Sequence, residues 1–167
     1  IWQSVWCEAV PTTYVTRLHT EANVPGATVT IEFELNKWVA QGTTFSATLS
    51  YGDGILASGS VVVISDRGRL TLEIERQRNG QHYERLLWSP ENPRLITIEV
   101  EVGADKVASY TGLRSVGYAH GRFLLNDRPY YTRSVLNQGY RTASHLAAPS
   151  VEALKEEILL IKALGFN

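Results

Sequence analysis

The fold is decided by residues 87–102, which read LWSPENPRLITIEVEV. Pro90 and Pro93 exclude both a helix and a central strand in the first half of this segment, so that half must be an ordered turn. The indole of Trp88 beside them is large and needs a buried site. The second half alternates apolar and polar residues, as a strand with one buried face does. The segment therefore predicts a corner of a β-structure that leads directly into a core strand.

The same alternation recurs on both sides of this corner. It is clearest at residues 28–35, and the other segments are 14–19, 45–51, 55–64, 70–75 and 107–113. Turn residues such as Gly52-Asp53-Gly54 and Asn79-Gly80 separate them. About seven short strands at this spacing are typical of a sandwich of immunoglobulin type. We therefore predict an all-β fold, an immunoglobulin-like antiparallel β-sandwich over residues 12–113. The Cys-Trp-Cys pattern of antibody domains is missing, because Cys7 is the only cysteine.

The pattern changes after Arg114. Residues 123–131 read FLLNDRPYY and predict a hairpin whose turn is Asn126-Asp127-Arg128. A second extended stretch runs on to about Leu136, and a polar loop follows over residues 137–149. We expect a C-terminal hairpin and strand that follow the sandwich.

One α-helix is predicted after the polar loop. Ser150 is a candidate N-cap, Glu152 lies in the first turn, and Gly165 follows the last periodic residue. The apolar stripe of this helix comprises Leu154, Ile158, Ile161 and Leu164. Leaving such a stripe in water forfeits roughly 1.5 to 3 kcal/mol per side chain. We therefore expect the stripe to be covered by the sandwich or by a second copy of the chain, or the helix to be poorly ordered.

Composition limits the classes of partner. The chain has 167 residues, 16 basic and 17 acidic side chains, and a net charge of −1. Nucleic acids and acidic membranes usually need a basic excess, and no apolar run reaches the roughly twenty residues of a membrane span. We expect neither a nucleic-acid nor a membrane partner.

Cys7 is interpreted as a small buried apolar residue rather than a reactive thiol. The chain has no Met and begins within a pattern, so we expect an internal piece of a longer protein, whose localisation these residues leave unknown.

Several motifs resemble the family-2 glycoside hydrolases, the family of β-galactosidases, β-glucuronidases and β-mannosidases. LWSPENP before a strand resembles the corner late in the family's immunoglobulin-like domain. GLRSV at residues 112–116, followed by GRFLLNDRP at 121–129, is similar to the family's junction GxRxx and FxLNGKP. APS at 148–150 with KALGFN at 162–167 resembles the end of the first barrel helix.

The resemblance implies a division of the chain into three parts. Residues 1–11 would be the exit of an N-terminal sugar-binding jelly-roll domain, and residues 12–113 the immunoglobulin-like sandwich. Residues 114–167 would be the incomplete beginning of the (β/α)8 catalytic barrel. The sandwich would contact the jelly roll and the barrel within one polypeptide.

The resemblance also implies a chemistry. Family members hydrolyse β-glycosides with retention, using two glutamates on later barrel strands and no cofactor. Neither strand is present in the chain, so we expect the full-length parent to bind and cleave a carbohydrate and the chain alone to be inactive. The alternative is a stand-alone β-sandwich module for carbohydrate binding or adhesion. Such a module has no use for a strand, loop and helix after the sandwich.

The candidate site residues follow from the barrel architecture. Active sites of such barrels lie at the carboxyl ends of the strands. Asn137, Gln138, Tyr140 and Arg141 would therefore face the sugar cleft of a complete barrel. The family's usual His is absent here, which leaves the substrate open. The alternative is a loop that merely packs on the neighbouring jelly roll.

Three other features favour structure over chemistry. The pairs Glu32/Glu34, Glu73/Glu75 and Glu99/Glu101 each place two Cα atoms about 6.6 Å apart, within the range of glycosidase carboxyls. Each pair lies opposite an apolar face, which favours a solvated sheet surface. His19, His82, His120 and His145 have no ligand spacing, so no metal site is expected. For Trp88, core packing is favoured over sugar stacking.

Overall fold

The computed structural model describes residues 5–40, 42–74 and 85–167. The chain divides into two compact units, one of residues Ala9–Pro129 and one of Ile1–Glu8 with Tyr130–Asn167. The first unit therefore includes the hairpin that follows residue 113. The three-part division expected from the resemblance stays a prediction. Glu75, the Asn79-Gly80 turn and His82 lie outside the described residues.

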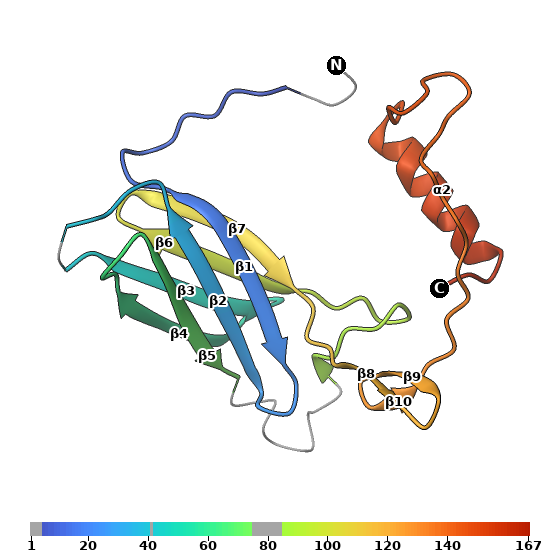
Figure 1. Ribbon diagram of the computed structural model, residues 1–167, viewed down its shortest axis with the longest axis horizontal. Coiled ribbons are helices and arrows are strands. Elements are labelled where there is room, and N and C mark those ends of the chain that lie inside the picture. The colour runs from blue at the N-terminus through green and yellow to red at the C-terminus, as the bar shows by residue number, and fades with distance from the viewer. Residues whose placement is uncertain (1–4, 41, 75–84) are drawn as a thin grey trace. The chain divides into compact units, whose positions relative to one another are not determined.

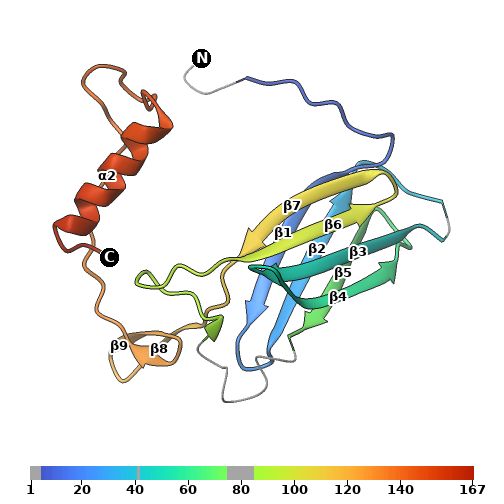
Figure 2. The same ribbon diagram turned by 180° about the vertical axis from the view of Figure 1, so that it is seen from behind.

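Two antiparallel sheets form the sandwich of the first unit. The smaller has the order β1 (Val15–Asn23), β2 (Thr28–Leu35), β5 (Arg67–Glu73), and the larger has the order β4 (Gly54–Val62), β3 (Thr44–Tyr51), β6 (Ile96–Val102), β7 (Asp105–Thr111). Figures 1 and 2 show them as two layers, seen from opposite sides. The chain crosses between the sheets after β2, β4 and β5. The predicted all-β sandwich is confirmed.

The core lies between the two sheets and follows the alternation of the sequence. On β2 the inward residues Val29, Ile31 and Phe33 are buried, and on β6 every second residue from Ile96 to Val102 is buried. Phe33 and Phe45 stack across the layers with ring centroids 3.8 Å apart. On β1 the pairing register shifts between Val15 and Arg17. This bulge explains why that strand alternates less cleanly than its neighbours.

The proline corner is an ordered turn, as predicted. Ser89 and Asn92 exchange two backbone hydrogen bonds of 3.0 Å, and the Ser89 hydroxyl accepts a third from the Asn92 amide. The backbone N–H of Trp88 donates to the Leu113 carbonyl at 2.8 Å. The Trp88 ring is half-buried, and the guanidinium carbon of Arg114 lies 5.0 Å from its centroid. The indole packs at the corner and also carries a cation on its face.

A third, small sheet follows the sandwich strands. Its order is β10 (Arg128–Pro129), β9 (Arg122–Leu125), β8 (Val116–Ala119). The predicted hairpin is confirmed, but its turn has two residues, Asn126 and Asp127, because Arg128 already pairs with Leu125. Both turn residues have left-handed backbone, with φ of 53° and 62°. Strand β8 was not predicted, because its side chains do not alternate between buried and exposed.

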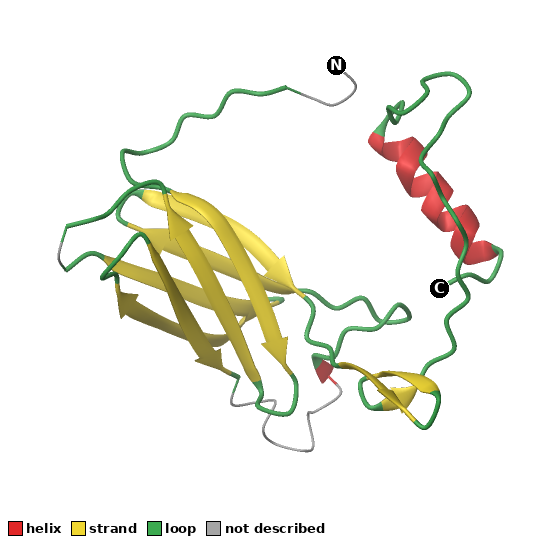
Figure 3. Ribbon diagram, in the orientation of Figure 1, coloured by secondary structure: helices red, strands yellow, loops and turns green. Residues whose placement is uncertain are grey.

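The second unit contains helix α2 (Val151–Ala163), coloured red in Figure 3. Ser150 is its N-cap, and its hydroxyl accepts the Ala153 amide at 3.1 Å, as predicted. No residue of α2 is buried, and Leu154, Ile158 and Leu164 are 42%, 57% and 67% exposed. The helix is regular within its own unit, and cover of its stripe by the sandwich or by a second copy stays a prediction. No helix among the described residues is long and apolar enough to cross a membrane.

The N-terminal segment corrects one expectation. Cys7 is exposed, not buried, and Trp6 is exposed beside it. The physical reason is that residues 5–11 pair with no described strand and so form no face that could be covered.

Candidate functional site

The predicted site residues lie on a loop that precedes α2. Residues 130–149 form no regular strand, and Figure 3 shows them as a continuous loop. The extended stretch predicted up to Leu136 therefore has no ladder partner among the described residues. Asn137 opens the ordered part of the loop, since its Oδ1 accepts the Gly139 amide at 2.8 Å. Gly139 has φ of 68°, a left-handed conformation that glycine adopts without strain.

One carboxylate on α2 holds two points of this loop. Asn137 Nδ2 donates to Glu157 Oε1 at 3.0 Å, and Arg141 Nη2 donates to Glu157 Oε2. The Arg141 and Glu157 side chains are 20% and 32% exposed, so this ion pair is partly withdrawn from water. Two of the four predicted residues are therefore brought together by a third residue.

The rest of the loop is closed on itself. Arg141 and His145 exchange two backbone hydrogen bonds, of 2.7 and 2.8 Å, around residues 142–144. His145 has φ of 55°, a left-handed conformation that is uncommon for a residue other than glycine. The Tyr140 hydroxyl lies 3.4 Å from His145 Nδ1, and both side chains are exposed. The loop thus has a fixed backbone and presents polar side chains to solvent.

The four predicted residues fall into two groups. Asn137 and Arg141 bind Glu157, whereas the side chains of Gln138 and Tyr140 are exposed. The role of all four in contacting a sugar stays a prediction.

Glu157 was missed from the sequence, because the partly buried face of α2 is apparent only in the structure. Ala153, Glu157, Ile161 and Gly165 recur every fourth residue and are partly buried, as is Phe166. An acidic residue on the covered face of a helix needs a partner, because a buried charge is costly without one. The predicted stripe is centred on Leu154 and Ile158. The partly buried face of the helix is instead formed by the residues just before them, Ala153 and Glu157.

The end of the chain returns to the extended stretch. Asn167 donates its backbone amide to the Arg133 carbonyl at 3.1 Å, and Asn167 Oδ1 accepts the Arg133 amide at 2.7 Å. Asn167 Nδ2 also donates to the Tyr131 carbonyl at 3.1 Å. The segment after α2 therefore lies beside the extended stretch before the loop, although neither forms a strand.

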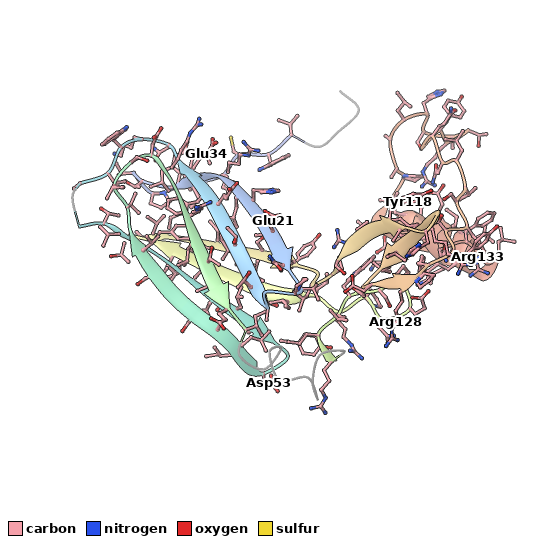
Figure 4. The ribbon with its side chains drawn as sticks, turned by 60° about the horizontal axis from the view of Figure 1, so that its bottom comes forward. Glu21, Glu34, Asp53, Tyr118, Arg128 and Arg133 are labelled. Carbon is pink, nitrogen blue, oxygen red and sulfur yellow. The ribbon has the colours of Figure 1, made fainter. Side chains whose placement is uncertain are left out.

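The outer face of the sheet formed by β1, β2 and β5 holds a groove of about 390 Å³. Charged side chains of opposite sign pair across its strands. Glu34 Oε1 on β2 lies 3.5 Å from Arg17 Nη1 on β1 and 3.6 Å from Arg67 Nε on β5. Figure 4 labels Glu34 and Glu21 on this sheet. Cross-strand pairs of this kind stabilise a solvated face. Glu34 therefore acts as a partner of basic residues here.

The pair Glu99 and Glu101 is likewise exposed on β6. Lys106 Nζ donates to Glu101 at 2.7 Å, and this hydrogen bond raises the pKa of Lys106, with the charges of Glu101 and Glu99 adding to the effect. Among the described residues, no three His, Cys, Asp or Glu side chains gather as a metal site would require.

Comparison with known proteins gives matches at the level of structure. No family model and no curated protein matches the chain. A β-glucuronidase of Lactobacillus rhamnosus matches with a TM-score of 0.70 at 20% identity, over 95% of this chain and 25% of that chain. A β-glucuronidase of Ruminococcus gnavus matches with a TM-score of 0.70 at 18% identity, over 95% and 25%. A β-glucuronidase of Dictyoglomus thermophilum matches with a TM-score of 0.65 at 21% identity, over 94% and 25%.

These matches concern the fold. The chain spans about a quarter of the length of each solved structure, and each match covers nearly all of the chain. A coverage of 95% of 167 residues leaves about eight residues outside. The 38 residues from Tyr130 to Asn167 are therefore largely inside the match.

Proposed function

We propose that the chain is a portion of a family-2 glycoside hydrolase whose full-length parent hydrolyses O-glycosyl bonds of a β-glycoside with retention. The portion would comprise the linking immunoglobulin-like domain and the opening of the (β/α)8 barrel. The match to three β-glucuronidases over 94–95% of the chain carries this proposal, because it includes the loop and helix as well as the sandwich. A stand-alone sandwich has no use for that tail.

Two further observations support the barrel opening. Asn167 hydrogen-bonds to the backbone of Tyr131 and Arg133, so the end of the chain lies beside the stretch before the loop, as neighbouring strands of a barrel would require. The loop between them is ordered by its own hydrogen bonds, as a loop at the carboxyl end of a barrel strand must be to position groups around a substrate.

The role of the chain in such a parent would be positional. The sandwich would set an N-terminal sugar-binding domain against the barrel, so that loops from both shape one cleft. The two catalytic glutamates of the family belong to later barrel strands, so the chain alone would not hydrolyse glycosides. The alternative of a stand-alone carbohydrate-binding or adhesion module has less support, because the groove on the sandwich is lined by paired charges.

The test compares two proteins on nitrophenyl β-glycosides. We expect the protein translated from the full reading frame to hydrolyse at least one such glycoside with retention, and the 167-residue chain to give only the rate of the buffer. Hydrolysis by the chain alone would refute its positional role. A full-length protein that lacks two glutamates at barrel strand ends, or cleaves no glycoside in the panel, would refute the parent activity.

A further inference from the structure

The loop before α2 depends on a single side chain of that helix. Both oxygens of the Glu157 carboxylate are used, one by Asn137 and the other by Arg141. These donors lie 20 and 16 residues before Glu157 in the chain. One helix residue thus ties down both ends of the segment 137–141.

This contact can resist the motion of the loop. Hydrogen bonds to a carboxylate are shorter and about twice as strong as those between neutral groups, and partial burial weakens the competition from water. The side chains of Arg141 and Glu157 are only 20% and 32% exposed, although most of the loop is exposed. The ion pair is therefore a partly shielded polar contact in a mostly exposed loop.

The contact with Glu157 also occupies the side chains of two of the four predicted site residues. Arg141 gives its guanidinium to Glu157, and Asn137 uses its amide nitrogen on Glu157 and its oxygen on Gly139. Gln138 and Tyr140 lie between them in the loop and expose an amide and a phenol, the phenol hydroxyl lying 3.4 Å from His145 Nδ1. These two groups suit the hydroxyls of a sugar.

We propose that Glu157 is a positioning residue, which latches Asn137 and Arg141 so that Gln138 and Tyr140 are held toward a sugar substrate. The latch itself is a property of this chain, whereas the sugar-facing role rests on the proposed function.

The first experiment measures amide hydrogen exchange in the 167-residue chain. Glu157→Gln should speed exchange at Gly139, Arg141 and His145 about tenfold, because their hydrogen bonds depend on the latched loop. Exchange in β6 should not change. Glu156→Gln is the matched control, since Glu156 is the exposed neighbour on the same helix. Unchanged exchange in Glu157→Gln, or equal effects of both variants, would refute the latch.

A second variant guards against unfolding of the helix. If Glu157→Gln also speeds exchange within α2, Asn137→Asp is measured instead, because it removes the donor to Glu157 without altering the helix and keeps an oxygen for the Gly139 amide. Faster exchange at Arg141 and His145 in that variant supports the latch. Unchanged exchange refutes it.

The second experiment uses the full-length protein and separates the latch from substrate contact. Glu157→Gln should raise KM by several-fold with a smaller effect on kcat. The charge-swapped double variant Arg141→Glu with Glu157→Arg should recover part of the loss that Arg141→Glu causes alone. If the double variant recovers none of the lost activity, Arg141 contacts the substrate itself. That result would refute the proposal that Arg141 acts only through Glu157. If the wild-type protein has no glycosidase activity, the proposed function fails, while the exchange experiment still decides the latch.

Discussion

At the scale of single residues, Asn126 connects three segments of the sandwich unit. Its Oδ1 accepts the Ser115 amide at 3.1 Å, and its Nδ2 donates to the Trp88 carbonyl at 3.0 Å. The same residue starts the two-residue turn between β9 and β10 with φ of 53°. Asparagine suits this position because it tolerates left-handed backbone while its amide offers a donor and an acceptor. The small sheet is thereby fastened to the proline corner.

Replacement of Asn126 should therefore cost more than its backbone conformation alone. We expect Asn126→Ala to lower the free energy of unfolding by about 1 to 3 kcal/mol more than Asp127→Ala does, measured by urea denaturation. Asp127 is the matched control, because it has φ of 62° in the same turn and an exposed side chain. Both variants place an alanine in left-handed backbone. The difference between their free energies of unfolding therefore measures the two side-chain hydrogen bonds of Asn126. Equal destabilisation would show that these bonds contribute nothing.

At the scale of elements, β5 approaches β2 at a glycine. Gly68 is paired with Phe33, and a Cβ at Gly68 would lie 2.5 Å from Phe33 Cζ. The ring cannot retreat freely, because it stacks on Phe45 with centroids 3.8 Å apart. The absence of a side chain at this position lets the sheet close over the aromatic pair.

We expect Gly68→Ala to destabilise the sandwich unit by about 1 to 3 kcal/mol, as overpacked core positions do. Gly117→Ala is the control, because a Cβ there would lie 3.9 Å from the nearest atom, which is an ordinary contact. Both substitutions remove the same unfolded-state freedom, so their difference in thermal stability isolates the clash. A Gly68→Ala protein as stable as Gly117→Ala would contradict the crowding at Phe33.

Some of the elements could be predicted from the sequence and others could not. Alternation predicted β2, β3 and β6 because one face of each is buried and the other is solvated. It could not reveal β8, whose side chains are mostly exposed on both faces. Barrel architecture predicted the loop that carries Asn137 and Arg141, but not Glu157, since the packing face of α2 depends on contacts that periodicity does not contain.

At the scale of the whole molecule, the apolar stripe of α2 bears on behaviour in solution. Its members are Leu154, Ile158, Ile161 and Leu164, and all except Ile161 are exposed within their unit. Leu159 and Leu160 extend the apolar surface on the same helix. Burial of each such side chain is worth roughly 1.5 to 3 kcal/mol, which favours association between copies when no other surface is offered.

We therefore expect the purified 167-residue chain to associate through α2 as its concentration rises, which sedimentation velocity would show as a shift from monomer to a larger species. Ile158→Lys should keep the chain monomeric, because it places a charge in the middle of the stripe. Ile64→Lys is the control: Ile64 is also an exposed apolar residue, but it belongs to the sandwich unit. A chain that stays monomeric at every concentration, or that responds equally to both variants, would exclude the helix as the contact surface. The stripe would then need a different partner, and in the proposed parent that partner is the rest of the barrel.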